Sequence, residues 1–162
     1  MGRRLLAAVA LAGGAVFAIS GCAPQPAAPE RNEQGAVSAK LNNADVFTLR
    51  VGDCVNVNSG ANANLRAVAV VPCEESHKAE IYHAFDNTAE NYPGEAELQK
   101  VGNETCLAQF KGFVGREYEE STLEVWPVYP SAASWEADDR QTLCVVASSG
   151  RSLTGTLKGK DI

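Results

Sequence analysis

The stretch CVNVNSGANANLRAVAVVPC, residues 54–73, begins and ends with cysteine and decides the fold. Valine-rich runs at 55–58 and 66–71 predict two strands, and the intervening residues 59–64 carry the Gly and Asn typical of turns. A hairpin centred between Ala63 and Asn64 places Cys54 opposite Cys73. Facing Cβ atoms on antiparallel strands lie about 4.5–5.5 Å apart, which is close to disulfide range.

Two further cysteines, Cys106 and Cys144, lie in the same part of the chain. An even number of cysteines in an exported domain predicts two disulfides, and four cysteines allow about three connectivities. The hairpin selects Cys54–Cys73, which leaves Cys106–Cys144. Each bridge would stabilise the domain by roughly 3–4 kcal/mol in the chain-entropy model.

Metal binding is the more specific alternative for the cysteines and the two histidines near them. Cys54, Cys73, His77 and His83 form a nominal zinc set, but structural zinc pairs usually begin with cysteines about two to four residues apart. A catalytic Cys–His pair requires a free thiolate, and two disulfides leave none. We therefore expect no metal, no cofactor and no catalytic residue.

Outward from the hairpin, the pattern predicts more strands and one long helix. A strand at 79–85 would present Ala79, Ile81, His83 and Phe85 on one face. The Tyr92-Pro93-Gly94 break precedes an apolar stripe at helical spacing. Further strands are expected at 46–49, 123–129, 142–147 and 153–157. The predicted fold class is α+β, a mostly antiparallel sheet with one long packed helix and two disulfides.

The N-terminus has the pattern of a lipoprotein signal peptide. Arg3 and Arg4 precede an uncharged run at 5–19, which is shorter than the roughly 20 residues that span a bilayer. The run ends in Ile19-Ser20-Gly21-Cys22, which resembles the bacterial lipobox. We expect residues 1–21 to be removed and Cys22 to carry the lipid. The protein would then be held on the extracytoplasmic face of the cell membrane by two or more acyl chains.

Composition after Cys22 favours a linker followed by one acidic domain. Residues 22–44 are rich in Pro, Ala and polar residues, which predicts a flexible linker reaching roughly 25 Å, and 45–162 form the domain. This domain should fold without residues 1–44. Removing the signal peptide leaves 12 basic and 20 acidic residues, a net charge of −8. Such a surface argues against nucleic acid as a partner.

Landmarks over roughly 50–159 resemble the septum-formation family of extracytoplasmic domains found in actinobacteria. They are Gly52-Asp53-Cys54, Val71-Pro72-Cys73 with His77 and Glu80, Tyr92-Pro93-Gly94-Glu95, Cys106, Tyr129-Pro130, Ser134-Trp135, Asp139-Arg140 before Cys144, and Thr154-Gly155-Thr156-Leu157-Lys158-Gly159. One departure is Asp138, where the family usually has glycine, so the local turn geometry is in question. The resemblance implies a role at the septum or envelope and brings no catalytic mechanism with it.

Four landmark residues are candidates for binding: His77, Trp135, Asp139 and Arg140. His77 could be a ligand or a pH-sensitive contact, or could bond a loop beside the disulfide. Trp135 could form an exposed pair with Trp126, or both could anchor the core. Asp139 and Arg140 could act as a functional charge pair or as a local salt bridge.

Two functions from different classes follow. The preferred one is a non-enzymatic module that binds another envelope protein or cell-wall material. The alternative is a small extracytoplasmic hydrolase or ligand-sensing domain with an unrecognised pocket. A concave pocket with convergent polar groups would favour the alternative, whereas a flatter surface would favour a scaffold.

Overall fold

The computed structural model describes residues 25–58 and 65–162. The predicted signal peptide, the lipidated Cys22 and the predicted turn at 59–64 lie outside the described residues. In the part described, no helix is both long and apolar enough to cross a bilayer.

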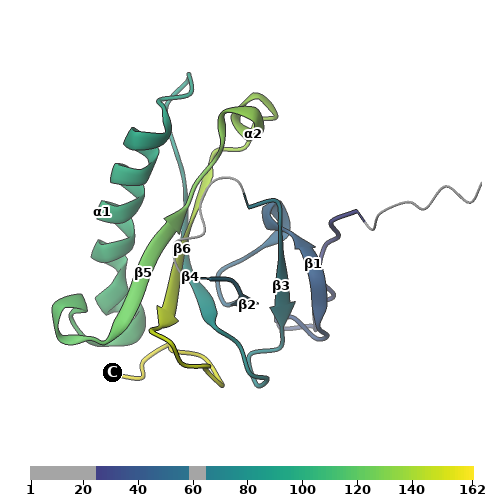
Figure 1. Cartoon of the computed structure of the whole chain (residues 1–162), viewed down its shortest axis with the longest axis vertical. Helices are drawn as coiled ribbons and strands as arrows, with labels where there is room; N and C mark the ends of the chain where they lie inside the picture. Colours follow the sequence, from purple (N-terminus) through teal and green to yellow (C-terminus); the bar gives the residue numbers. More distant parts are fainter. Residues whose placement is uncertain (1–24, 59–64) are drawn as a thin grey trace, which may run out of the picture.

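Six strands form one curled antiparallel sheet in the order β1-β3-β2-β4-β6-β5 (Figure 1). The strands are β1 Leu41–Asp45, β2 Cys54–Asn56, β3 Ala67–Val71, β4 Ala79–Asp86, β5 Leu123–Val128 and β6 Gln141–Ser148. The helices are α1 Glu95–Val114 and α2 Ala132–Glu136, with single 3₁₀ turns η1 Val46–Thr48 and η2 Tyr118–Glu120. The predicted α+β class is confirmed.

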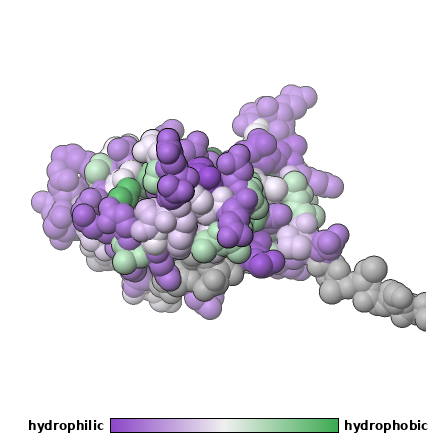
Figure 2. Space-filling model, turned by 90° about the horizontal axis from the view of Figure 1, so that it is seen from above, coloured by the Kyte–Doolittle hydropathy of each residue, from purple (hydrophilic) through white to green (hydrophobic). Residues whose placement is uncertain are grey.

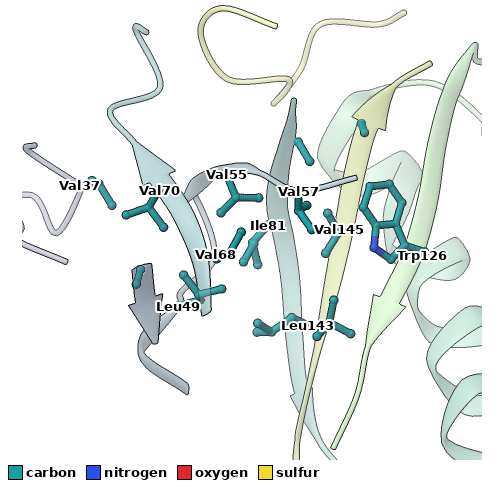
Figure 3. Close-up of a cluster of buried hydrophobic side chains, with 14 residues drawn as sticks. Val37, Leu49, Val55, Val57, Val68, Val70, Ile81, Trp126, Leu143 and Val145 are labelled. Carbon is teal, nitrogen blue, oxygen red and sulfur yellow. The ribbon is translucent and has the colours of Figure 1, made fainter. Parts of the chain in front are cut away.

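The sheet has an apolar core on each face. One core fills the inside of the curl, where side chains from β1, β2 and β3 meet Ile81, Trp126 and Val145 from the other strands (Figure 3). The second core lies between the sheet and α1, where Phe110 and Val114 pack near Val146. Because both faces are covered, β6 is almost continuously apolar, as expected for a strand buried on two sides.

Helix α1 presents a stripe of buried residues spaced four apart: Leu98, Gly102, Cys106, Phe110 and Val114. Its first turn carries Glu95 and Glu97 and its last turn carries Lys111, charges that interact favourably with the helix dipole. Gly115 ends the helix in the left-handed conformation, as glycine commonly does. Gly102 is required for close approach, because a Cβ there would lie 2.6 Å from Cβ of Pro127.

Both predicted disulfides are confirmed: Cys54–Cys73 and Cys106–Cys144. The second joins α1 to β6. The hairpin register differs from the prediction by two residues, since Cys54 faces Val71 and not Cys73. A shift of two keeps each side chain on its face, so Cys54 still reaches Cys73.

Three details of the predicted strands are wrong. Residues 46–48 form η1, because Asp45 caps the turn by accepting a hydrogen bond from the Phe47 amide. In β4 the pairing with β6 shifts between Ile81 and His83, and this bulge turns His83 to the face opposite Ile81. Residues 153–157 contribute only a single bridge, between Leu153 and His77.

The described part of the predicted linker, residues 25–44, packs on the domain instead. Val37 is 6 % exposed and lies in the first core, and Ala44 on β1 is fully buried. Strand β1 completes the sheet by pairing with β3. The prediction failed because Pro-rich composition suggests disorder, whereas a few well-placed contacts order this segment.

Candidate functional site

A cleft of about 610 Å³ opens between α2 and the turn η1. The ends of β5 and β6 supply its apolar part through Val128 and Leu143, and Pro26 from the N-terminal segment also lines it. This volume falls within the roughly 300–1,000 Å³ of typical ligand sites. The domain therefore has a concave surface, not a uniformly flat one.

The first wall is α2, which a capping box holds in place. The Ser131 hydroxyl accepts from the Ser134 amide at 3.1 Å, and the Ser134 hydroxyl accepts from the Ser131 amide at 3.0 Å. Ser134 lines the cleft, but its hydroxyl forms this cap and also donates to the Ser131 carbonyl. The Ser134 hydroxyl therefore stabilises the first turn of α2.

Behind this wall, Trp135 supports Arg140. The Arg140 guanidinium lies 4.2 Å from the Trp135 ring centroid and donates to the carbonyls of Trp135 and Asp139 at 2.8 and 3.0 Å. Trp135 is 5 % exposed and meets the Tyr92 ring edge-on at 5.8 Å. Arg140 is thus held at the cleft by a cation–π contact and by two carbonyls.

The turn after α2 depends on Asp138. This residue has φ of +69°, in the left-handed region, which accounts for the glycine that the septum-formation landmarks lead one to expect there. Its carboxylate lies 3.6 Å from Arg140, and the neighbouring Asp139 accepts from the Gln141 amide at 3.1 Å. Asp139 and Arg140 therefore form a local network with the backbone.

The second wall is the start of η1. Phe47 is 57 % exposed, although it is a large aromatic residue, and it lines the cleft. The Val46 amide donates to the Arg66 carbonyl at 3.2 Å, which holds the residue just before β3 at the same wall. Leu65 adds apolar surface beside Arg66.

Acidic groups exceed basic ones around the cleft. Its lining includes four carboxylates, Asp45, Asp86, Asp138 and Asp139, and two guanidinium groups, Arg66 and Arg140. Figure 2 views the molecule from the end that carries α2 in Figure 1, and this surface is mostly hydrophilic with smaller neutral and apolar patches. The arrangement suits a ligand that has both apolar and positively charged groups.

Tyr129 also lines the cleft and connects it to α1. Its hydroxyl donates to Glu95 at 3.3 Å, at the start of the helix. Burial, and then the nearby Glu95 carboxylate, raise the pKa of the phenol. Tyr129 therefore stays neutral at physiological pH.

His77 lies away from the cleft, in the segment between Cys73 and β4. It is 1 % exposed, and its Nδ1 is 2.8 Å from the Glu75 carbonyl. Its backbone exchanges two hydrogen bonds with Leu153, at 3.1 and 2.7 Å. This geometry matches the alternative in which His77 bonds a loop.

Glu80 is a buried residue whose role the sequence did not reveal. It is 1 % exposed, and its carboxylate accepts from the Thr156 hydroxyl at 2.6 Å and the Leu157 amide at 2.7 Å. It also lies within 4.8 Å of the sulfurs of Cys54 and Cys73, but the disulfide uses both sulfurs. Glu80 therefore holds the C-terminal segment, and the only signal for this was its place among the family landmarks.

The structure thus brings together Asp139 and Arg140 at the cleft, with Trp135 buried behind them, and leaves His77 elsewhere. Trp126 and Trp135 do not form an exposed pair. Trp126 is only 8 % exposed and lies in the first core, and Trp135 is buried as well, so the alternative in which both anchor the core is the correct one. Sequence reasoning missed Phe47, Arg66 and Asp86. No local pattern marks them, because the curl of the sheet assembles them from distant segments.

Fold and disulfides define a small α+β domain of the class that matures in an oxidising, extracytoplasmic compartment. A family model described as "Septum formation" matches residues 51–161, and the chain belongs to this family. Neither a curated protein nor a solved structure matches the chain.

Proposed function

We propose that this protein is a lipid-anchored, non-enzymatic binding module of the cell envelope, and that it recognises its partner through the cleft between α2 and η1. The observation that most directly supports this proposal is the exposed Phe47, which lines a cleft of about 610 Å³ that combines apolar and charged groups. Aromatic residues are enriched at the centres of binding sites. The partner is another envelope protein or cell-wall material, and the family suggests a place at the septum.

The chemistry of the cleft supports binding over catalysis. Ser134 is committed to the helix cap, and neither histidine of the chain lines the cleft. Asp139 and Arg140 are held by backbone groups. Nucleophilic catalysis needs a nucleophile within hydrogen-bond reach of a base, and the described lining offers no such pair.

A ligand-sensing domain is the second candidate. The surface is concave and carries polar groups, which is the feature expected to favour this alternative over a flat scaffold, and the volume suits a small molecule. Such a domain would use the same lining residues. The two candidates differ in what is captured, a macromolecule or a small molecule.

Anchoring through Cys22 rests on the lipobox pattern and on the disulfides, which fit an extracytoplasmic location. Metabolic labelling with a fatty-acid analogue tests it. The unmodified chain should take up the label and sediment with membranes, and Cys22→Ala should do neither. A labelled, membrane-bound Cys22→Ala protein would refute the anchor.

Proximity labelling from the full chain in cells tests the cleft. Phe47→Asp should remove the labelled partner, because it places a charge on the exposed aromatic wall. Leu107→Asp is the matched control, since Leu107 is 42 % exposed on α1 and does not line the cleft. If Phe47→Asp and Leu107→Asp leave the same labelling pattern as the unmodified chain, the cleft is not the binding site.

A further inference from the structure

The segment just after the proposed lipid anchor is fixed to the domain. Ala27 forms a parallel bridge with Ala44, and its amide donates to the Asn43 carbonyl at 3.1 Å. The Asn43 side chain also donates to the Gln25 carbonyl at 2.9 Å. These contacts leave no long free tether between Cys22 and the domain.

The covalent chain therefore limits how far the cleft can lie from the lipid. Pro26 lines the cleft and is four residues after Cys22. A fully extended chain spans at most about 3.3–3.6 Å per residue, so the two Cα atoms lie within about 14 Å of one another. A lipid on Cys22 would hold that residue in the headgroup region, which places the cleft beside the bilayer surface.

We propose that the cleft faces the membrane and binds an extended, basic and apolar peptide segment of a protein held in the same membrane. This inference rests on the proposed function, both on the anchor at Cys22 and on the cleft as the binding site. It specifies the chemistry of the partner and where the partner must be.

The charges of the cleft select a cationic occupant. Asp86 is exposed at the end of β4, and Asp138 is 96 % exposed at the turn after α2. The guanidinium of Arg140 lies 3.6 Å from Asp138 and offsets one carboxylate, and Arg66 offsets another, so the four carboxylates of the lining keep an excess over the two guanidinium groups. Lysine or arginine side chains of a peptide would therefore meet the carboxylates, while apolar side chains would contact Phe47 and Leu143.

A phospholipid headgroup fits this lining less well than a peptide. Its phosphate would face an excess of carboxylates, and the chain after the signal peptide has a net charge of −8. Anionic membrane surfaces attract basic segments and not acidic ones. The lipid on Cys22 thus positions the cleft, and the peptide fills it.

A short tether also removes the need for high intrinsic affinity. Confinement to one membrane raises the effective concentration of a partner, and that concentration falls as the tether lengthens. Inserting about 20 Gly/Ser residues between Pro24 and Gln25 would let the domain move some 25 Å from the anchor. Such an insertion alters the geometry but no residue of the cleft.

The test uses the lipidated full chain in phosphatidylcholine nanodiscs, observed by NMR. Nitroxide-headgroup lipids should broaden the amide signals of Phe47 and Ala133 and spare that of Leu107, and the Gly/Ser insertion should abolish the broadening. A pool of tetrapeptides with two lysines and two large apolar residues should shift the same cleft signals. Its glutamate counterpart should not.

Charge variants sharpen the test. Asp86→Asn with Asp138→Asn should weaken binding of the lysine peptides about fivefold, in line with two exposed ion pairs. Glu104→Gln, on the exposed surface of α1, is the matched control and should leave binding unchanged.

The outcomes separate this inference from the proposed function. Unbroadened Phe47 and Ala133 signals, or no binding of the lysine peptides, would overturn the inference. Larger shifts with phosphatidylglycerol nanodiscs than with the peptides would assign the cleft to lipid and overturn it as well. The proposed function fails separately, if Phe47→Asp leaves proximity labelling unchanged or Cys22→Ala keeps its lipid.

Discussion

Arg31 donates two hydrogen bonds to the Asp53 carboxylate, at 2.6 and 2.8 Å, across 22 residues of sequence. Asp53 is 2 % exposed and also accepts from the Arg50 amide at 2.8 Å. Arg31 donates as well to the Thr48 carbonyl at 3.0 Å. The hydrogen bond to Asp53 raises the pKa of Arg31. This pair joins the segment before the family region to the first residues of that region.

Removing this arginine should destabilise the domain strongly. Arg31→Ala leaves the buried Asp53 carboxylate without its charged partner, and loss of one member of a buried pair costs about 3–5 kcal/mol. Because Arg31 keeps some exposure, we expect roughly 3 kcal/mol in urea unfolding. Arg50→Ala, at an exposed position nearby, is the control. Equal stabilities of the two variants would show that the pair contributes little.

The domain boundary should lie near Gln25 and not at Asp45. A fragment of residues 25–162 keeps Arg31, Val37 and strand β1, and should unfold cooperatively. A fragment of residues 45–162 exposes the edge of β3 and leaves Asp53 unpaired, so it should melt at least about 10 °C lower. Thermal unfolding by circular dichroism decides between them. A 45–162 fragment with an unchanged melting temperature would restore the linker interpretation.

Two glycines on α1 should respond oppositely to alanine. Gly102→Ala would place a Cβ 2.6 Å from Cβ of Pro127, and overpacking of this kind costs about 1–3 kcal/mol. Gly112→Ala meets nothing within 4 Å, so it should stabilise the helix by up to about 1 kcal/mol. Chemical denaturation of both variants measures the difference. Stabilisation by Gly102→Ala would mean that β5 can move away from α1.

These residues show what sequence can and cannot predict here. Local patterns were sufficient to locate β4, α1 and β6, because the apolar periodicity of each is long, and the Cys106–Cys144 bridge restricts how α1 and β6 pack together. The requirement for Gly102 was not visible in the sequence, where a glycine inside a helix is ordinarily unfavourable, because its neighbour Pro127 is distant in sequence. Arg31 and Phe47 carried no signal at all, because their roles depend on how the sheet curls. Asp139 and Arg140 were identified through family landmarks, but the cleft beside them was not.

Stability should fall at alkaline pH because of Tyr82. Its hydroxyl donates to the Cys106 carbonyl at 2.5 Å, and burial, followed by the nearby Tyr118, raises its pKa well above the usual value. Above about pH 10 the unfolded chain loses this proton while the folded chain keeps it, so the free energy of unfolding decreases as pH rises. Below about pH 10 this contribution is constant.

Tyr82→Phe provides the comparison. It should lower stability at neutral pH by about 1 kcal/mol, through loss of the hydrogen bond. It should also flatten the decline between about pH 10 and 12, since phenylalanine does not ionise. Urea unfolding across this range measures both effects. A slope identical to that of the unmodified protein would assign the alkaline decline to other groups.

The turn after α2 offers a stabilising substitution. Asp138 has φ of +69°, where an L-residue is strained and glycine is not, so Asp138→Gly should raise stability by up to about 1 kcal/mol. The contact that it removes, 3.6 Å to Arg140 from a side chain that is 96 % exposed, is worth little in water. Two further substitutions, at Asp139 and at Asp138 itself, test whether backbone strain is the cause.

Asp139→Gly should destabilise, because it removes the acceptor of the Gln141 amide and adds backbone freedom at a residue without positive φ. Asp138→Val should destabilise more, since a β-branched residue tolerates positive φ poorly. Thermal unfolding should therefore rank Asp138→Gly first, the unmodified protein second, and Asp139→Gly and Asp138→Val below it. If Asp138→Gly proves less stable than the unmodified protein, the Asp138 carboxylate matters more than backbone strain. The aspartate would then contribute to holding Arg140 at the cleft.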